Sequence, residues 1–120
     1  MEDADAPGRI DGSVPLVNAS ASPIVTDRPD ARRFEAHFGD ELVGFVGYRH
    51  IGSRRVLLHT EVLPRFEARG VGSALAIHIF ESARRDGERL TVTCPFLSAW
   101  LVRHPDYQDV ATVPPPAAAT

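Results

Sequence analysis

The most constraining feature of this chain is a long amphipathic segment that two glycines open, GVGSALAIHIFESARR over residues 70–85. Its apolar residues recur every three to four positions, which predicts one helix with a single apolar face. That face comprises Val71, Leu75, Ala76, Ile79, Phe80 and Ala83. Asp86-Gly87 is typical of a helix end. Gly70 and Gly72 are poor helix formers, so their position at the N-terminus indicates either a turn or a close approach to the backbone.

Alternating apolar and polar residues predict strands on both sides of this helix. Gly44 and Gly47 lie inside the second strand and are expected to mark a bulge there. The last helix should stop before Pro105. We therefore predict an α+β fold in which an antiparallel strand meander runs into one β-α-β crossover and a short C-terminal helix. The expected strands cover residues 32–38, 42–48, 56–63 and 90–94, and the short helix covers residues 96–104.

The two ends of the chain lack these patterns. Residues 1–30 are rich in Asp, Pro, Ser, Ala and Gly, and we predict a disordered extension in which Ile24 and Val25 could pair loosely with the first strand. Residues 111–120 are rich in proline and alanine and are predicted to be a disordered tail. One domain over residues 31–110 is the expected organisation.

Composition excludes several classes of function. A net charge of −3 argues against nucleic-acid binding. A single cysteine permits no internal disulfide and favours a reducing, cytoplasmic setting. No apolar run approaches the roughly 18 residues of a membrane-spanning helix, so we expect no membrane association. The expected protein is a monomer or weak dimer without a metal site.

The paired glycines, placed between a strand and a helix, are typical of a phosphate-binding loop. A P-loop requires Gly-Lys-Ser/Thr, and this chain has no lysine. A dinucleotide fingerprint requires Gly or Ala where Leu75 stands and an acidic residue where Cys94 stands. The third kind of phosphate loop binds the pyrophosphate of coenzyme A (CoA).

The stretch VLPRFEARGVGSAL resembles the acetyl-CoA loop of the GNAT superfamily of N-acetyltransferases. HTEV before it and CPFLSAWLVRHPDY after it resemble the minimal subfamily of predicted acetyltransferases. The resemblance spans about residues 32–110. It implies a small GNAT-like fold, acetyl-CoA as cosubstrate and transfer of an acetyl group to a primary amine of an acceptor. The donor-binding residues that it implies are Val62, Leu63, Arg69, Gly70, Val71, Gly72, Ser73 and Ala74.

Three residues depart from the superfamily pattern. Glu67 stands where the superfamily has Arg or Gln, and Ala68 replaces a common glycine. Trp100 stands where the subfamily often has tyrosine, and an indole cannot protonate a leaving thiolate. We expect Glu67 and Ala68 to weaken CoA binding rather than abolish it. Glu67 and Trp100 also favour the alternative function, a non-catalytic GNAT-like module that binds CoA or a partner.

Three side chains are candidates for the chemistry. His59 and Glu61 are two apart on a strand, so they should leave the same face about 7 Å apart and could relay a proton from the amine. An exposed polar strand face is the competing interpretation. Cys94 is either a buried small residue or, as the subfamily's Cys-Pro-Phe suggests, a residue that lines the pocket or acts as nucleophile. Tyr107 is expected to pack the C-terminal segment.

Overall fold

The computed structural model describes residues 22–114, so the predictions made for residues 1–21 and 115–120 lie outside the described residues. The elements along the chain are β2 (Ile24–Arg28), the 3-10 helix η1 (Pro29–Ala31), β3 (Arg33–Phe38), β4 (Glu41–Ile51), β5 (Arg54–Val62), the 3-10 helix η2 (Pro64–Arg69), α2 (Val71–Asp86), β6 (Leu90–Val92), α3 (Pro95–Arg103), the 3-10 helix η3 (Pro105–Tyr107) and β7 (Ala111–Thr112).

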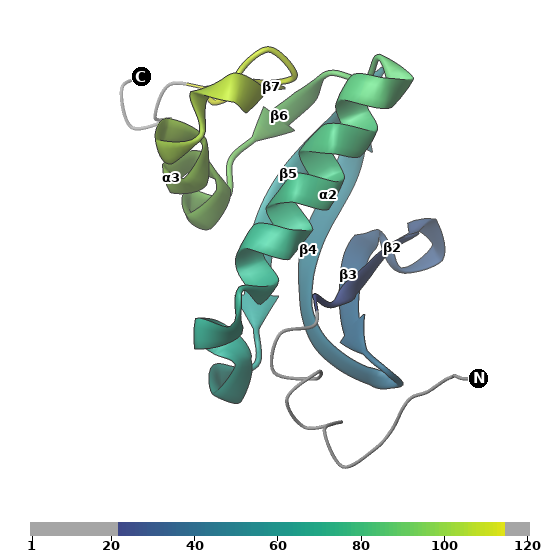
Figure 1. Ribbon diagram of the computed structural model, residues 1–120. Helices are drawn as coiled ribbons and strands as arrows, with labels where there is room; N and C mark the ends of the chain where they lie inside the picture. The colour runs from purple at the N-terminus through teal and green to yellow at the C-terminus, as the bar shows by residue number, and fades with distance from the viewer. Residues whose placement is uncertain (1–21, 115–120) are drawn as a thin grey trace, which may run out of the picture.

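The described strands form one mixed sheet in the order β2-β3-β4-β5-β6-β7. Strands β2 to β5 pair antiparallel, whereas β6 runs parallel to both β5 and β7. This arrangement confirms the predicted α+β fold, a meander followed by a β-α-β crossover. Figure 1 shows α2 lying across one face of the sheet, with α3 beside β6 and β7.

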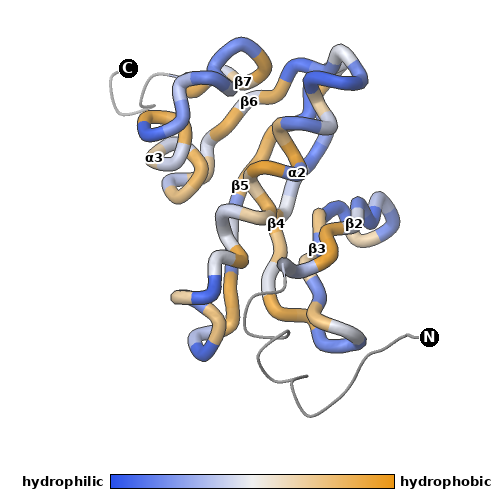
Figure 2. The backbone as a smooth tube through the Cα atoms, in the orientation of Figure 1, coloured by the Kyte–Doolittle hydropathy of each residue, from blue (hydrophilic) through white to orange (hydrophobic). Residues whose placement is uncertain are grey.

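Helix α2 packs on the sheet through the apolar face that its periodicity predicts. All six residues of that face are buried. In Figure 2, hydrophobic residues run along α2, β4 and β5, while the turns are hydrophilic. The helix approaches β4 closely at Gly44, where a Cβ would lie 2.9 Å from Val71 Cγ1. Gly44 is therefore required by the packing of the helix N-terminus on the sheet.

Two register shifts adjoin the glycines of β4, as expected for bulges. Ala36 pairs with Gly44 and His37 with Leu42, so Val43 is the extra residue of β4. Gly47 pairs with His59 and Tyr48 with Leu57, so Leu58 is the extra residue of β5. The second bulge thus lies on β5, opposite Gly47, and it reverses which residues of β5 face the helices.

The folded region extends beyond the predicted bounds of residues 31–110. Strand β2 lies in the segment predicted to be an extension, and it pairs with β3 along its whole length, from Ile24 opposite His37 to Arg28 opposite Arg33. Strand β7 lies in the predicted tail and pairs with β6 through Ala111. The pairing of Ile24 and Val25 with β3 agrees with the pairing expected for these two residues. The rest of β2 and all of β7 were not predicted, because both strands are too short for alternation to distinguish them from loops.

Helix α3 closes the other end of the core. Its Trp100 is 1% exposed and lies among Phe80, Tyr107 and His104. His104 at the helix end contacts the Trp100 carbonyl through Nδ1 at 2.9 Å. Tyr107 packs against the core and donates its hydroxyl proton to Glu81 at 2.6 Å, in keeping with its expected packing role. None of the helices among the described residues is long and apolar enough to cross a membrane.

Candidate active site

The N-terminus of α2 presents unpaired backbone donors. Gly70 ends η2 and starts α2 with φ of 79°, the left-handed conformation that glycine adopts without strain. The Ala74 N–H donates to the Gly70 carbonyl at 3.0 Å, and no side chain caps the helix. The amides of the first turn therefore have no intrahelical acceptor. Together with the positive end of the helix dipole they favour an anion at this position.

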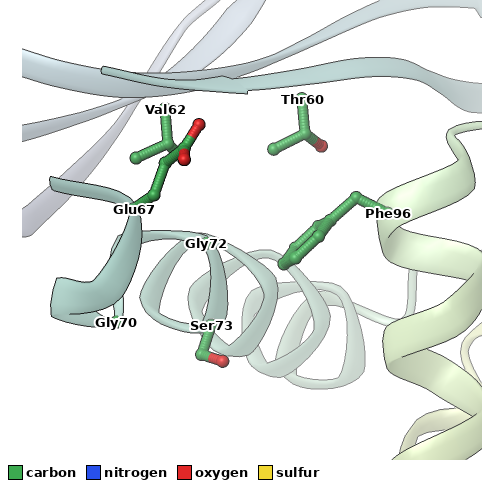
Figure 3. Close-up of a pocket in the computed structure, with 7 residues that line it drawn as sticks. All are labelled: Thr60, Val62, Glu67, Gly70, Gly72, Ser73 and Phe96. Atoms are coloured by element: carbon green, nitrogen blue, oxygen red, sulfur yellow. The ribbon is translucent and has the colours of Figure 1, made fainter. Parts of the chain in front are cut away.

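A cavity of about 360 Å³ opens beside this helix terminus. Figure 3 shows Thr60 and Val62 of β5 on one side, Gly72 of α2 on the other, Glu67 at one end and Phe96 at the other end. Its lining residues are Thr60, Val62, Glu67, Gly70, Gly72, Ser73 and Phe96. Four of the predicted donor-binding residues, namely Val62, Gly70, Gly72 and Ser73, are thus brought together.

The remaining predicted donor-binding residues lie around this cavity in different ways. The side chain of Val71 is buried against the sheet, so Val71 can contribute only its backbone N–H to the cavity. Ala74 already donates its N–H to Gly70. Leu63 is exposed beyond the end of β5. Arg69 stacks over Phe38 and Phe66 and lines a separate cavity together with them. The structure thus places the Arg69 side chain away from the cavity at the helix terminus.

Strands β5 and β6 diverge next to this cavity. Their pairing ends at Leu57 opposite Val92, and the Thr93 N–H still donates to the Leu57 carbonyl at 3.0 Å. Beyond that point β5 continues to Val62 with β4 as its partner, whereas the segment after β6 leads into α3. The fold therefore leaves a gap between β5 and the segment that follows β6.

Cys94 lies at the closed end of this gap. Its side chain is 1% exposed, and its Sγ is 3.0 Å from Thr60 Oγ1. Thr60 lines the cavity, whereas Cys94 lies behind it. A thiol without access to solvent is a poor nucleophile, so this placement favours the interpretation as a buried small residue.

His59 and Glu61 lie on the opposite face of β5. Successive side chains of a strand alternate, and Thr60 and Val62 point into the cavity. The His59 and Glu61 side chains leave the same face, as expected, and bend toward each other, so that Nε2 and Oε2 are 2.9 Å apart; the side chains are 59% and 61% exposed. The pair is thus in direct contact and open to solvent on the sheet face that α2 does not cover.

A chain of contacts supports this pair from the neighbouring strands. The Phe45 ring meets the His59 ring edge-on with centroids 6.2 Å apart. The Arg33 guanidinium lies 4.7 Å from the Phe45 centroid, and its Nε donates to Glu35 at 2.7 Å. Glu35 is the buried charged residue among the described residues. These contacts support the imidazole from the neighbouring strands β3 and β4.

Charge in the cavity is carried by Glu67. Among the lining residues it is the one ionisable side chain, and Figure 3 shows its carboxylate pointing toward Val62. The nearby Arg65 forms an ion pair with Glu41. An anion at the α2 terminus would therefore meet backbone amides and one carboxylate.

Phe96 and Thr60 are site residues that the sequence analysis did not select. The Phe96 ring packs end-on against Gly72: a Cβ there would lie 2.6 Å from Phe96 Cζ. This contact explains why position 72 is a glycine, independently of the approach of an anion. The Cys-Pro-Phe sequence was the available signal for Phe96, and Thr60 could have been found by strand alternation, since it lies two positions before Val62.

Comparison with known proteins identifies the family. Residues 33–110 match the family described as GCN5-related N-acetyl-transferase. The chain belongs to this family. The fold of this GNAT protein is similar to the NMR solution structure of a GCN5-like candidate N-acetyltransferase from Staphylococcus aureus, with a TM-score of 0.59 and 21% sequence identity over 78% of this chain and 92% of that one. Among curated proteins, none matches the chain.

Proposed function

We propose that this GNAT protein transfers an acetyl group from acetyl-CoA to a primary amine. The observation that carries the proposal is the cavity at the uncapped N-terminus of α2, next to the point where β5 and β6 diverge. The helix terminus suits the diphosphate of the donor, and the gap between the strands gives its thioester a path into the fold. Family membership supports the same reaction.

The donor would lie with its phosphates at the amides of Val71, Gly72 and Ser73. Its pantetheine arm would then run along β5 past Val62 and Thr60, whose side chains line the cavity. Glu67 opposes this binding because its carboxylate lines the same cavity. The donor is thus held by backbone donors and apolar contacts, with a repulsion that salt screens.

The acceptor would approach from the other face of β5. There the exposed His59–Glu61 pair can take the proton that the amine loses. The amine nitrogen attacks the thioester carbonyl carbon, a C–N bond forms, the C–S bond breaks, and CoA leaves as the thiolate. Direct attack agrees with the position of Cys94, which is buried behind Thr60 and out of reach of the acceptor.

Binding and turnover test the proposal separately. Calorimetry with acetyl-CoA should show binding that tightens in Glu67→Gln. Asp86→Asn removes the same charge at the far end of α2 and serves as the matched control. Release of free thiol in the presence of a panel of amines then reports transfer. No binding of acetyl-CoA, or equal effects of the two substitutions, contradicts the placement of the donor.

The second candidate function is a module that holds CoA without turnover. Two observations favour it: the Glu67 carboxylate in the cavity, and Trp100 at the position where the subfamily often has tyrosine. The Trp100 indole donates to Ser73 Oγ at 3.2 Å and has no acid function. Binding of CoA without thiol release from any amine in the panel would support this alternative.

A further inference from the structure

The sheet face that α2 leaves uncovered lacks a side chain at Gly47, in the middle of β4 (Figure 1). The strand register places Gly47 directly between Arg33 of β3 and His59 of β5. Neighbouring strands are about 4.8 Å apart, so the Cα atoms of Arg33 and His59 lie about 10 Å from each other across the glycine. The face therefore has a backbone floor with a guanidinium on one side and an imidazole on the other.

Neither the backbone nor the packing requires a glycine at position 47. Gly47 is not among the described glycines with positive φ. A Cβ there would have one neighbour within 4 Å, the His59 carbonyl oxygen at 4.0 Å. Gly44 of the same strand differs, because a Cβ at that position would lie 2.9 Å from Val71 Cγ1. The missing side chain at Gly47 thus leaves free space on the open face and serves no contact within the fold.

The guanidinium beside this floor is held in place by its neighbours. Arg33 lies 4.7 Å from the Phe45 ring centroid, and its Nε donates to Glu35 at 2.7 Å. The Glu35 carboxylate is nearly buried and also lies 3.7 Å from the guanidinium of Arg28. Two arginines therefore share one carboxylate, and the local charge is positive. The Arg33 side chain is 31% exposed, and a guanidinium has five N–H donors, so it retains donors for a second anion.

The opposite side of the floor carries negative charge. There the exposed Glu61 carboxylate lies 2.9 Å from His59 Nε2. An amine is an ammonium ion at neutral pH before it loses its proton, and a carboxylate attracts that ion. Arg49, two residues after Gly47 in β4, is exposed and lies on the same face by strand alternation, where it adds to the positive side.

We infer that the acceptor is an amine that also carries a carboxylate, an inference that rests on the proposed function. Such a molecule would lie over Gly47, with its amine at the His59–Glu61 pair and its carboxylate at the Arg33 guanidinium. A guanidinium pairs with a carboxylate through two parallel N–H···O bonds, which fixes the orientation of the acceptor as well as holding it. The space at Gly47 admits the carbon chain between the two charged groups.

The first test compares acceptors that differ in charge alone. Free-thiol release from acetyl-CoA is measured with 4-aminobutyrate and 6-aminohexanoate, each beside its amide, which has the same length without the charge. For the length that fits better, kcat/KM of the acid should exceed that of the amide by about tenfold or more. Arg33→Gln should bring this ratio close to one. Arg33→Lys keeps the charge that faces Glu35 and should retain part of the ratio, so it replaces the glutamine variant if that variant fails to fold.

The matched control is Arg89→Gln, which removes an exposed arginine between α2 and β6 and should leave the ratio unchanged. A second test fills the floor. Gly47→Val should raise KM for the acids by about tenfold or more and leave the dissociation constant of acetyl-CoA unchanged, because the donor binds on the other face. Gly47→Ala should have a smaller effect in the same direction. Melting curves of both variants verify that they are folded.

Equal kcat/KM for acid and amide in the wild type, or a ratio that stays within about twofold of wild type in Arg33→Gln, would overturn the inference. If the wild type binds acetyl-CoA and acetylates none of these amines, an NMR titration of the CoA complex decides through the Gly47 amide resonance. A resonance that the acids shift and the amides do not supports the inference, whereas one that does not move overturns it and leaves the donor site standing. Failure to bind acetyl-CoA refutes the proposed function itself.

Discussion

The contact between Gly72 and Phe96 leads to a stability prediction that can be worked out from the structure. Gly72 has ordinary helical backbone geometry, so Gly72→Ala is free of backbone strain. Alanine in a helix is more favourable than glycine by about 1 kcal/mol. The new Cβ would, however, lie 2.6 Å from Phe96 Cζ, whereas ordinary contacts begin at 3.4 Å. The ring must therefore retreat by roughly 0.8 Å.

That retreat moves the Phe96 side chain off its preferred rotamer, which costs about 0.5–1.5 kcal/mol. The cost nearly cancels the gain in helix propensity, so Gly72→Ala alone should leave stability almost unchanged. In the Phe96→Ala background the ring is gone, and the same substitution should stabilise the fold by up to about 1 kcal/mol. The coupling energy in the double-mutant cycle is thus about 1 kcal/mol.

Urea unfolding followed by tryptophan fluorescence measures all four proteins. The sequence has a single tryptophan, and Trp100 is 1% exposed in the core, so its emission reports the global transition. Additivity within about 0.3 kcal/mol would refute the argument, because it would mean that Gly72 is not needed for the ring. Gly72 would then be explained by the approach of an anion alone.

Three further predictions follow from the described contacts. Burial, assisted by the charge of Arg85, lowers the pKa of His78 below 6.5, so the unfolded chain binds more protons and the fold loses stability as the pH falls below 6.5. Urea titrations should show that His78→Asn loses less stability than the wild type between pH 7 and 5.5, and an equal loss would contradict this prediction. Glu61→Gln should reduce turnover by about 10²-fold or more, whereas Cys94→Ser should change it by less than about tenfold; a kinetically competent acetyl group on Cys94, seen by intact-protein mass spectrometry, would reverse this order. Gly70→Ala should cost about 1–2 kcal/mol because φ is 79°, and an unchanged urea midpoint would show that the turn relaxes.

Periodicity was sufficient to predict the elements that carry most of the core. The buried face of α2 has the same six residues in the sequence pattern and in the structure, since a long helix repeats its pattern several times. Short elements carry no such signal. Strand β7 has two residues and pairs with β6, which precedes α3 in the chain. The sequence of β2, IVTDR, contains two apolar residues, too few to show an alternating pattern.

The sequence predicted only the part of the candidate site that is formed by residues close together in the chain. The glycines of the α2 terminus belong to such a stretch, and the structure places them at the cavity. The position of Phe96 at the cavity depends on the packing of α3 against α2, in which Phe96 contacts Gly72, 24 positions earlier in the chain. The direct contact of His59 with Glu61 likewise depends on side-chain rotamers, which strand spacing alone does not determine.

In the proposed reaction, the bulge at Leu58 determines which side chains of β5 would contact the donor and which would contact the acceptor. Leu57 is buried on the helix-covered face, and strict alternation would place His59 on that same face. Because Leu58 is an extra residue, His59 and Glu61 instead point to the open face, and Thr60 and Val62 point into the cavity. The proposal therefore assigns Val62 and Thr60 of β5 to the donor, and His59 and Glu61, on the other face of the same strand, to the amine. Direct transfer without a covalent intermediate on Cys94 is proposed because Cys94 is buried behind Thr60, whereas the bulge leaves the His59–Glu61 pair open to solvent on the other face of β5.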